Sequence, residues 1–285
     1  MKTSNPALSE STFRNLPGGR YGNRPQSQAA IWPGTQYGER FGGSIGNRSE
    51  SMTLNGTINK TGVLLLCAFA TAAFTWYQFV QAAQQTGSAS EAMGVVTPYL
   101  FGGMIGGLIF AMITIFKKEW APVTAPAYAL LEGLVLGGLS AVFELRYPGI
   151  AIQAVGLTFG TLFAMLFLYR TGVIKVTGKF RLGVFAATGG IALFYLMQMV
   201  LGMFHINFNG PNSVNGSGVI GIGFSLIVVG VAALNLVLDF DFIEKGVEYG
   251  APKYMEWYGA FGIMVTLVWL YLEMLRLLSK MRSRN

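Results

Sequence analysis

Carboxylates within apolar sequence are the groups in this chain that could do chemistry. The segment LNLVLDFDFIEKG, residues 234–246, closes a long apolar run with Asp239 and Asp241 placed among phenylalanines. Glu132 lies in a second apolar run, YALLEGLVLGG. A carboxylate kept away from water holds a proton more readily than a solvated one, and its oxygens suit a hard cation such as Ca²⁺. The predicted chemistry is therefore reversible binding of protons or Ca²⁺.

The two aspartates cannot serve one cavity together. They are two residues apart, which is about 200° around a helix. Asp239 shares its face with Asn235 one turn earlier, and we predict that it lies inside the protein. Asp241 shares its face with Glu244 and Lys245, and we predict a solvated residue at the helix end.

The other acids differ in their predicted depth. Glu132 is nine residues into its apolar run, about 14 Å at 1.5 Å per residue, which places it near the membrane midplane. Glu256 begins the last apolar run at its cytoplasmic end. Glu144 and Glu273 fall near the outer ends of their runs, where we expect wetted carboxylates. Ionisable residues within membrane spans usually face a cavity, the bundle interior or a partner.

The elements that position these residues are predicted from composition. Of 285 residues, 52% are hydrophobic and 12% are charged, against roughly 25% charged in a soluble domain. Apolar stretches of about 18 residues or more indicate transmembrane helices. There are seven, at 61–80, 96–116, 123–143, 150–169, 182–204, 217–240 and 256–278. The predicted fold is an all-α membrane protein with seven transmembrane helices.

The sequence contains too few cysteines and histidines for several kinds of site. Cys67 is the only cysteine and His205 the only histidine. An intramolecular disulfide, a CxxC motif and most zinc or Ser–His sites are thereby excluded, and we do not expect an enzyme or a cofactor.

Basic residues predict the orientation of the chain. Cytoplasmic segments of membrane proteins carry an excess of Lys and Arg. With the N-terminus in the cytoplasm, that side holds most of the basic residues and the outer loops hold only Arg146. The cytoplasmic set is Lys2, Arg14, Arg20, Arg24, Arg40, Arg48, Lys60, Lys117, Lys118, Arg170, Lys175, Lys179, Arg181, Lys245 and Lys253. Seven full spans would then place the basic C-terminus outside, whereas a re-entrant last segment would reverse it.

The first 58 residues differ from the rest. They are rich in Ser, Asn, Gly, Pro and Arg, a composition that cannot bury enough apolar surface to become ordered. We predict a flexible basic cytoplasmic tail at 1–58 and a transmembrane domain at 59–285. The arginines of the tail could contact anionic lipid or a partner, or the tail could be simply solvated.

Small residues four apart recur in the spans. Such pairs let helix backbones approach closely in lipid. They are Gly102 and Gly106, Gly103 and Gly107, Gly133 and Gly137, and Gly156 and Gly160. Packing is the favoured interpretation, with hinges for gating as the alternative.

Three segments resemble the bacterial Bax inhibitor-1/YccA family. They are NGTINKTG, PAYALLEGLVLGGLSAVFE and DFDFIEKGVEYGAPKYMEWYGAFGIMVTLVWLYLEMLRLLSKMR. The similarity covers about residues 50 to 282. It implies a seven-helix bundle with the last helix at its centre, and a pH-sensitive calcium leak. It also implies a pair of aspartates in the last two helices that senses pH and binds calcium, with a basic residue after the second helix that can pair with the first aspartate.

The resemblance carries over only in part. Asp239 matches the aspartate of the sixth helix, and Lys117 falls where the basic residue is expected. The second aspartate falls on Thr266, which cannot ionise. Glu256 and Glu132 are then the possible substitutes, since one begins the right helix and the other has the right depth.

Two functions remain open. The first is a passive calcium leak in the bacterial inner membrane, regulated by protonation of an interior carboxylate. The second is a non-conducting regulator that binds other membrane proteins, such as a membrane protease. The expected partners are the lipid bilayer, Ca²⁺ and protons, with other membrane proteins as a further class and no nucleic acid.

Overall fold

The computed structural model describes residues 51–204 and 213–284. The helices within these ranges are α2 (Leu54–Thr86), α3 (Ala89–Phe116), η3 (Lys118–Trp120), α4 (Ala121–Arg146), α5 (Ile150–Arg170), α6 (Gly178–Met203), α7 (Val219–Glu248) and α8 (Met255–Arg284). All belong to one compact unit, Gly46–Asn285. The described ranges hold no β-strand beyond an isolated bridge between Ser51 and Pro252.

Seven of these helices are long and apolar enough to cross a membrane. Hydrocarbon offers no hydrogen bonds to a backbone, so an apolar run at this depth becomes helical. Local signals end the runs: Gly87 and Gly149 take positive φ angles of 65° and 81°, which glycine adopts without strain. The chain is an integral membrane protein, and the predicted all-α fold is confirmed.

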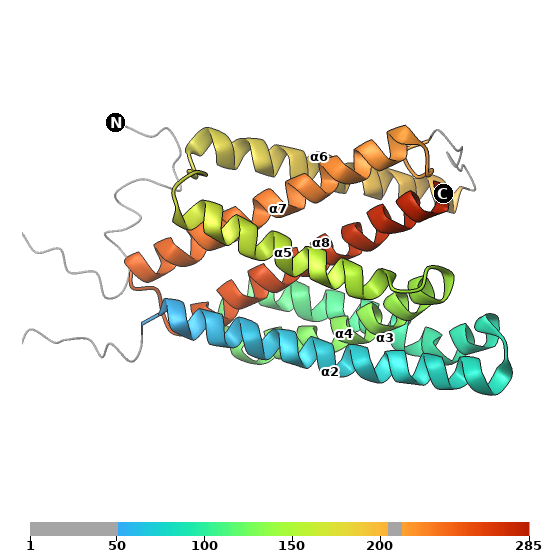
Figure 1. Cartoon of the computed structure of the whole chain (residues 1–285). Coiled ribbons are helices and arrows are strands. Elements are labelled where there is room, and N and C mark those ends of the chain that lie inside the picture. The colour runs from blue at the N-terminus through green and yellow to red at the C-terminus, as the bar shows by residue number, and fades with distance from the viewer. Residues whose placement is uncertain (1–50, 205–212, 285) are drawn as a thin grey trace, which may run out of the picture. The chain divides into compact units, whose positions relative to one another are not determined.

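The helices run back and forth between two ends of the bundle (Figure 1). We call the end at which α2 begins the proximal end, and the end at which α2 finishes the distal end. α8 begins at the proximal end and reaches the distal end in one continuous helix. The last segment is therefore a full span rather than a re-entrant one.

α8 occupies the centre of the bundle, as the resemblance implied. It packs against α2, α4, α5 and α7, and it is the most buried of the seven spans. α3 packs chiefly on α4 and α2, and α6 chiefly on α7. α6 is the most exposed span, so it is the helix with the fewest constraints on its position.

Glycines account for the closest helix contacts. A Cβ on Gly133 or Gly137 would collide with the backbone of α2 at Ala68 or Ala72, and one on Gly103 would lie 2.7 Å from the carbonyl oxygen of Leu131 on α4. These glycines serve packing, as predicted. Around Gly156 and Gly160 the described chain places nothing within 4 Å of such a Cβ.

Helical structure begins earlier in the chain than the sequence suggested. α2 starts at Leu54, within the tail predicted for 1–58. Met52 is 2% exposed, and its N–H donates to the carbonyl of Ala251 at 2.7 Å. A single apolar residue such as Met52, placed just before the helix N-cap, forms no periodic pattern. Its burial could therefore not be predicted from the sequence. Arg14, Arg20, Arg24, Arg40 and Arg48 lie outside the described residues.

Gly137→Ala should destabilise the protein because the added methyl group meets α2 backbone that cannot move aside. The expected loss is about 1–3 kcal/mol of unfolding free energy, measured as a lower midpoint of thermal unfolding in detergent. Gly156→Ala is the matched control and should leave the midpoint unchanged. Equal effects of the two changes would contradict the packing assigned to Gly137.

A reporter fused after Asn285 should report the side of the membrane opposite Leu54, because an odd number of spans separates them. With Leu54 on the cytoplasmic side, we expect a reporter that works only in the cytoplasm to be silent after Asn285. The same reporter should be silent when inserted after Thr86 and active when inserted after Lys118. Activity at the C-terminus would mean that one of the seven helices does not cross.

Candidate functional site

Asp239 lies on α7 and faces the central helix. Its Oδ2 accepts a hydrogen bond of 2.7 Å from the Thr266 hydroxyl on α8. Gly262, one turn before Thr266, also lies beside the carboxylate: a Cβ there would stand 3.7 Å from the other oxygen, Oδ1, which is an ordinary van der Waals contact. The carboxylate is half-buried and has no basic partner in the described chain. It is an acid held at a helix interface by a neutral hydroxyl.

Asn235 turns toward a different helix. Its Nδ2 donates to the Thr188 hydroxyl of α6 at 2.8 Å and to the carbonyl of Val231 at 2.9 Å. Asp239 and Asn235 share a face of α7, yet one contacts α8 and the other α6. Together they make α7 the polar link between those two helices.

Asp241 is not the solvated residue that we predicted. It is 8% exposed, and its Oδ2 accepts from Arg181 of α6 and from Lys245, both at 2.7 Å. A carboxylate leaving water needs such compensation. The sequence showed Lys245 one turn away, but the first turn of α6 that delivers Arg181 could not be placed from it.

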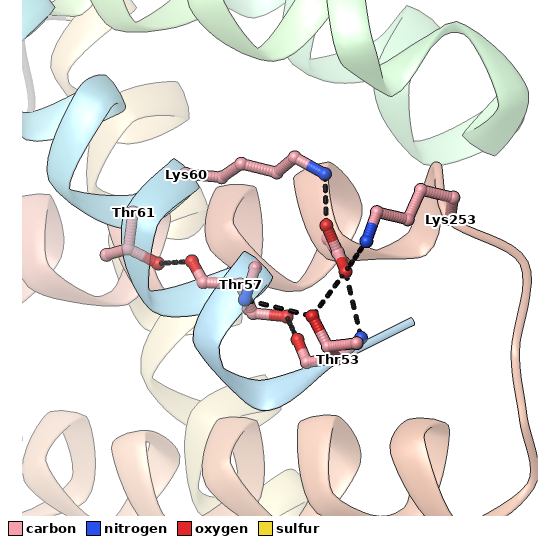
Figure 2. A network of polar contacts seen from close by, with 7 residues as sticks. Thr53, Thr57, Lys60, Thr61 and Lys253 are labelled. Atoms are coloured by element: carbon pink, nitrogen blue, oxygen red, sulfur yellow. Dashed lines mark hydrogen bonds and ion pairs between the residues drawn. The ribbon is translucent and has the colours of Figure 1, made fainter. Parts of the chain in front are cut away.

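Glu256 is 1% exposed and is fully engaged at the proximal end. Its Oε1 accepts from the N–H and the hydroxyl of Thr53, both at 2.8 Å, and pairs with Lys253 at 3.0 Å. Its Oε2 pairs with Lys60. Figure 2 shows Thr53, Lys60 and Lys253 converging on this point from the start of α2 and the start of α8. Glu256 joins two helices and does not meet Asp239.

Glu132 faces α3. A Cβ on Gly107 would stand 3.3 Å from its Oε2, so this glycine leaves the room that the carboxylate occupies. Glu132 is half-buried, and no hydrogen bond or ion pair connects it to another described residue. The structure does not bring it to Asp239 either.

Lys117 follows α3, as expected, but it does not pair with Asp239. Its ammonium lies 5.7 Å from the ring centroid of Trp120. The neighbouring Lys118 lies 5.3 Å from the ring of Tyr258 on α8. The two lysines are therefore held at the proximal end by aromatic rings.

Two buried charges near the distal end were missed. Glu273 is 2% exposed rather than wetted. Its Oε1 accepts from Arg276 at 2.6 Å and from the Tyr195 hydroxyl of α6 at 3.0 Å, and its Oε2 has no partner among the described residues. Lys280 is 8% exposed and donates to Val214 O, Gly221 O and Ser225 Oγ at 2.9, 3.1 and 2.9 Å.

A signal for these residues was present in the sequence. Thr266, Glu273 and Lys280 follow one another at intervals of seven, which is close to two helical turns and puts them on one side of α8. Ser225 and Asp239 lie on the facing side of α7. The α7–α8 contact is thus polar at several depths.

A family model for Bax inhibitor 1 like proteins matches residues 5–283. The chain belongs to the Bax inhibitor 1 like family. Neither the curated proteins nor the solved structures contain a match. In this member of the family, the residue that faces Asp239 across the last two helices is Thr266, the position to which the resemblance assigned the second aspartate.

The threonine at this position determines what the site can do. Two carboxylates at contact distance share a proton and titrate as a coupled pair. A threonine hydroxyl instead donates a hydrogen bond to an ionised carboxylate, and it can accept one from a protonated carboxyl group. Asp239 with Thr266 is therefore a single-proton site in which both protonation states can be satisfied.

Glu256→Gln should weaken the proximal end because Lys60 and Lys253 would lose their compensating charge. We expect a loss of about 1–3 kcal/mol in unfolding free energy, seen as a lower thermal midpoint in detergent that no change of salt restores. Glu248→Gln, at the exposed end of α7, is the control and should match the parent. If both variants match the parent, the cluster does not stabilise the fold.

Proposed function

We propose that the protein is a passive, pH-sensitive leak pathway for Ca²⁺, in which Asp239 binds protons and transiently binds the cation. The observation that supports it most directly is a carboxylate at membrane depth whose one bonded partner among the described residues is neutral. An acid that served stability alone would be expected to have a basic partner, as Asp241 and Glu256 do.

Polar groups extend from this site toward both ends of the bundle. On the proximal side are Arg181 and Asp241, and beside Asp239 the pair Asn235 and Thr188. On the distal side follow Tyr195, Glu273 and Arg276, and then Lys280 with Ser225. All come from α6, α7 and α8. The proposed route runs between these three helices.

In this proposal the described conformation is the closed one. Leu236 and Val237 are fully buried next to Asp239, and apolar constrictions of this kind block ions. α6 is the least buried span, so its displacement from α7 exposes the least apolar surface, while the bonds of Arg181 to Asp241 and of Asn235 to Thr188 oppose it. In the proposed open state α6 shifts and the polar groups of α7 and α8 line the gap.

Asp239 suits passage better than storage of the ion. Ca²⁺ takes six to eight oxygen ligands, whereas Asp239 and Thr266 together offer three oxygens. The rest would be water. An ionised Asp239 attracts the cation to the route, and protonation removes that attraction and also changes the contact between α7 and α8. The proton thereby biases the equilibrium between the closed and open packing.

The orientation belongs to the same proposal. The proximal end carries Lys60, Lys117, Lys118, Arg170, Lys175, Lys179, Arg181, Lys245 and Lys253. By the excess of basic residues it faces the cytoplasm, and the protein would reside in the inner membrane of a bacterium with Asp239 nearer the cytoplasmic side.

Asp239→Asn should remove most of the pH dependence of calcium flux across the neutral range. The amide copies the protonated form in charge and shape but cannot gain or lose a proton. The measurement is Ca²⁺ entry into liposomes that contain only this protein. Glu248→Gln is the control and should keep the parental profile. An unchanged profile in Asp239→Asn would place the sensor elsewhere, and an absence of flux in the parent would favour the non-conducting regulator.

Thr266→Asp offers a test that gains rather than loses a property. It places a second carboxylate against Asp239, and coupled acids titrate over two linked steps. We expect the pH profile of flux to change from a single-proton curve to one that spans two protonation steps. Thr266→Asn, which adds similar volume without a titrating group, should keep the single-proton curve.

A further inference from the structure

A cleft of about 500 Å³ lies between α2, α4, α5 and α8, on the side of α8 away from Asp239. Its floor is formed by Met264, Leu267 and Val268 of α8. Small side chains, including Ala72 and Ala73 of α2, form one wall, and Val155 of α5 belongs to the other. Pockets that bind organic ligands have volumes of about 300–1,000 Å³. The cleft is large enough for an extended alkyl chain.

The cleft exists because α2 is drawn toward α4. Gly133 and Gly137 bring α2 against α4, and α2 packs on α3, α4 and α8 rather than on α5. Phe69 of α2 and Phe159 of α5 bridge the space as stacked rings, with centroids 6.4 Å apart. The small residues beyond this pair leave the remainder open.

The polar side chains Ser140, Tyr271 and Glu144 of the cleft already have hydrogen-bond partners within the protein, so they do not require a polar ligand. The hydroxyls of Ser140 and Tyr271 hydrogen bond to each other at 2.6 Å. The oxygens of Glu144 are occupied by the N–H groups of Gly149 and Ala151. A dry apolar cavity does not hold water, and at this depth the surrounding medium is hydrocarbon. The occupant that fits these walls is an alkyl chain.

The distal end of the cleft has a different character. A smaller cavity of about 280 Å³ shares Trp76 and Glu144 with it and reaches Gln84 and Leu145. Next to Leu145 stands Arg146, which is exposed and whose guanidinium rests 5.8 Å from the ring of Tyr147. It has no ion pair within the described ranges. Arginine binds phosphate oxygens well because it presents several N–H donors in one plane.

We propose that one phospholipid occupies this site, with an acyl chain in the cleft and its phosphate at Arg146. The apolar walls match the chain, and the positive charge at the distal end matches the headgroup. The lipid belongs to the leaflet at the distal end of the bundle. It supports α8 through Met264, Leu267 and Val268, on the helix face opposite Thr266. This proposal does not rest on the proposed leak. The two can fail separately, because lipid binding is measured without ion flux.

The test uses the full chain with Trp76 as its only tryptophan, obtained by changing Trp32, Trp120, Trp257 and Trp269 to Phe. Phosphatidylglycerol brominated along its acyl chains is titrated into the protein in detergent. Bromine quenches a tryptophan that it touches. We expect quenching of Trp76 that saturates, because a site fills, whereas contact with bulk lipid would grow steadily with the amount added.

Two variants of this protein test the two parts of the proposal. Val155→Phe fills the cleft and should remove most of the saturable quenching. Its matched control is Val123→Phe, the same change at a position of α4 that is 73% exposed and outside the cleft, which should behave as the parent. In Arg146→Gln the lipid concentration at half-saturation should rise about tenfold, because the loss of one charge-assisted hydrogen bond weakens binding by about that factor.

The outcomes that overturn the proposal are distinct. Quenching in the parent that fails to saturate means that Trp76 meets only bulk lipid. If Trp76 of the parent is not quenched at all, the cleft has closed or a second copy of the chain fills it. Saturation unchanged in Val155→Phe places the lipid elsewhere. If Val155→Phe does not fold, Ala73→Leu fills the cleft from its exposed α2 wall and answers the same question.

Discussion

A charge removed from water must find a partner or give up its proton, and this bundle is arranged around that constraint. Its central helix carries Glu256, Glu273 and Lys280 through the protein interior. Glu256 gathers two lysines and a threonine, and Lys280 gathers three neutral oxygens. These contacts come from α2 and the residue before it, from α7 and the segment before it, and from the connection between α7 and α8. The neighbours of α8 are therefore fixed by polar bonds as well as by packing.

Asp239 and Glu132 depart from this arrangement, because neither has a basic partner among the described residues, and Asp239 differs from Glu132 in being bonded across a helix interface. Asp241, two residues later, is neutralised by Arg181 and Lys245, while Asp239 has a single neutral donor. The two acids are close in sequence and differ in chemistry because they face different helices. Asp241 joins α6 to α7 through an ion pair. Asp239 joins α7 to α8 through a neutral hydroxyl, and this is the contact that the proposed protonation would alter.

The elements could be predicted because hydrocarbon imposes length and polarity on any helix that crosses it. The interior position of Asp239 followed from the same periodicity. The partners could not be predicted, since Arg181 reaches Asp241 and Lys60 reaches Glu256 only after distant helices pack. The assignment of Glu273 to the wetted end failed for a simpler reason: distance from the end of an apolar run does not say which way a side chain points. The interval of seven from Thr266 to Lys280 would have said so.

The central position of α8 has a consequence for how the protein is made. The central helix α8 is synthesised after the six spans that pack around it, so those six must enter the bilayer before the element that holds them together exists. About 200 residues are synthesised after Thr53 and Lys60 before their partner Glu256 is added to the chain. Until then the vacant centre must stay loosely assembled or be filled by lipid. Assembly is completed by a helix that brings its own buried charges into place, so chains shortened at the C-terminus lose the axis of the bundle rather than its edge.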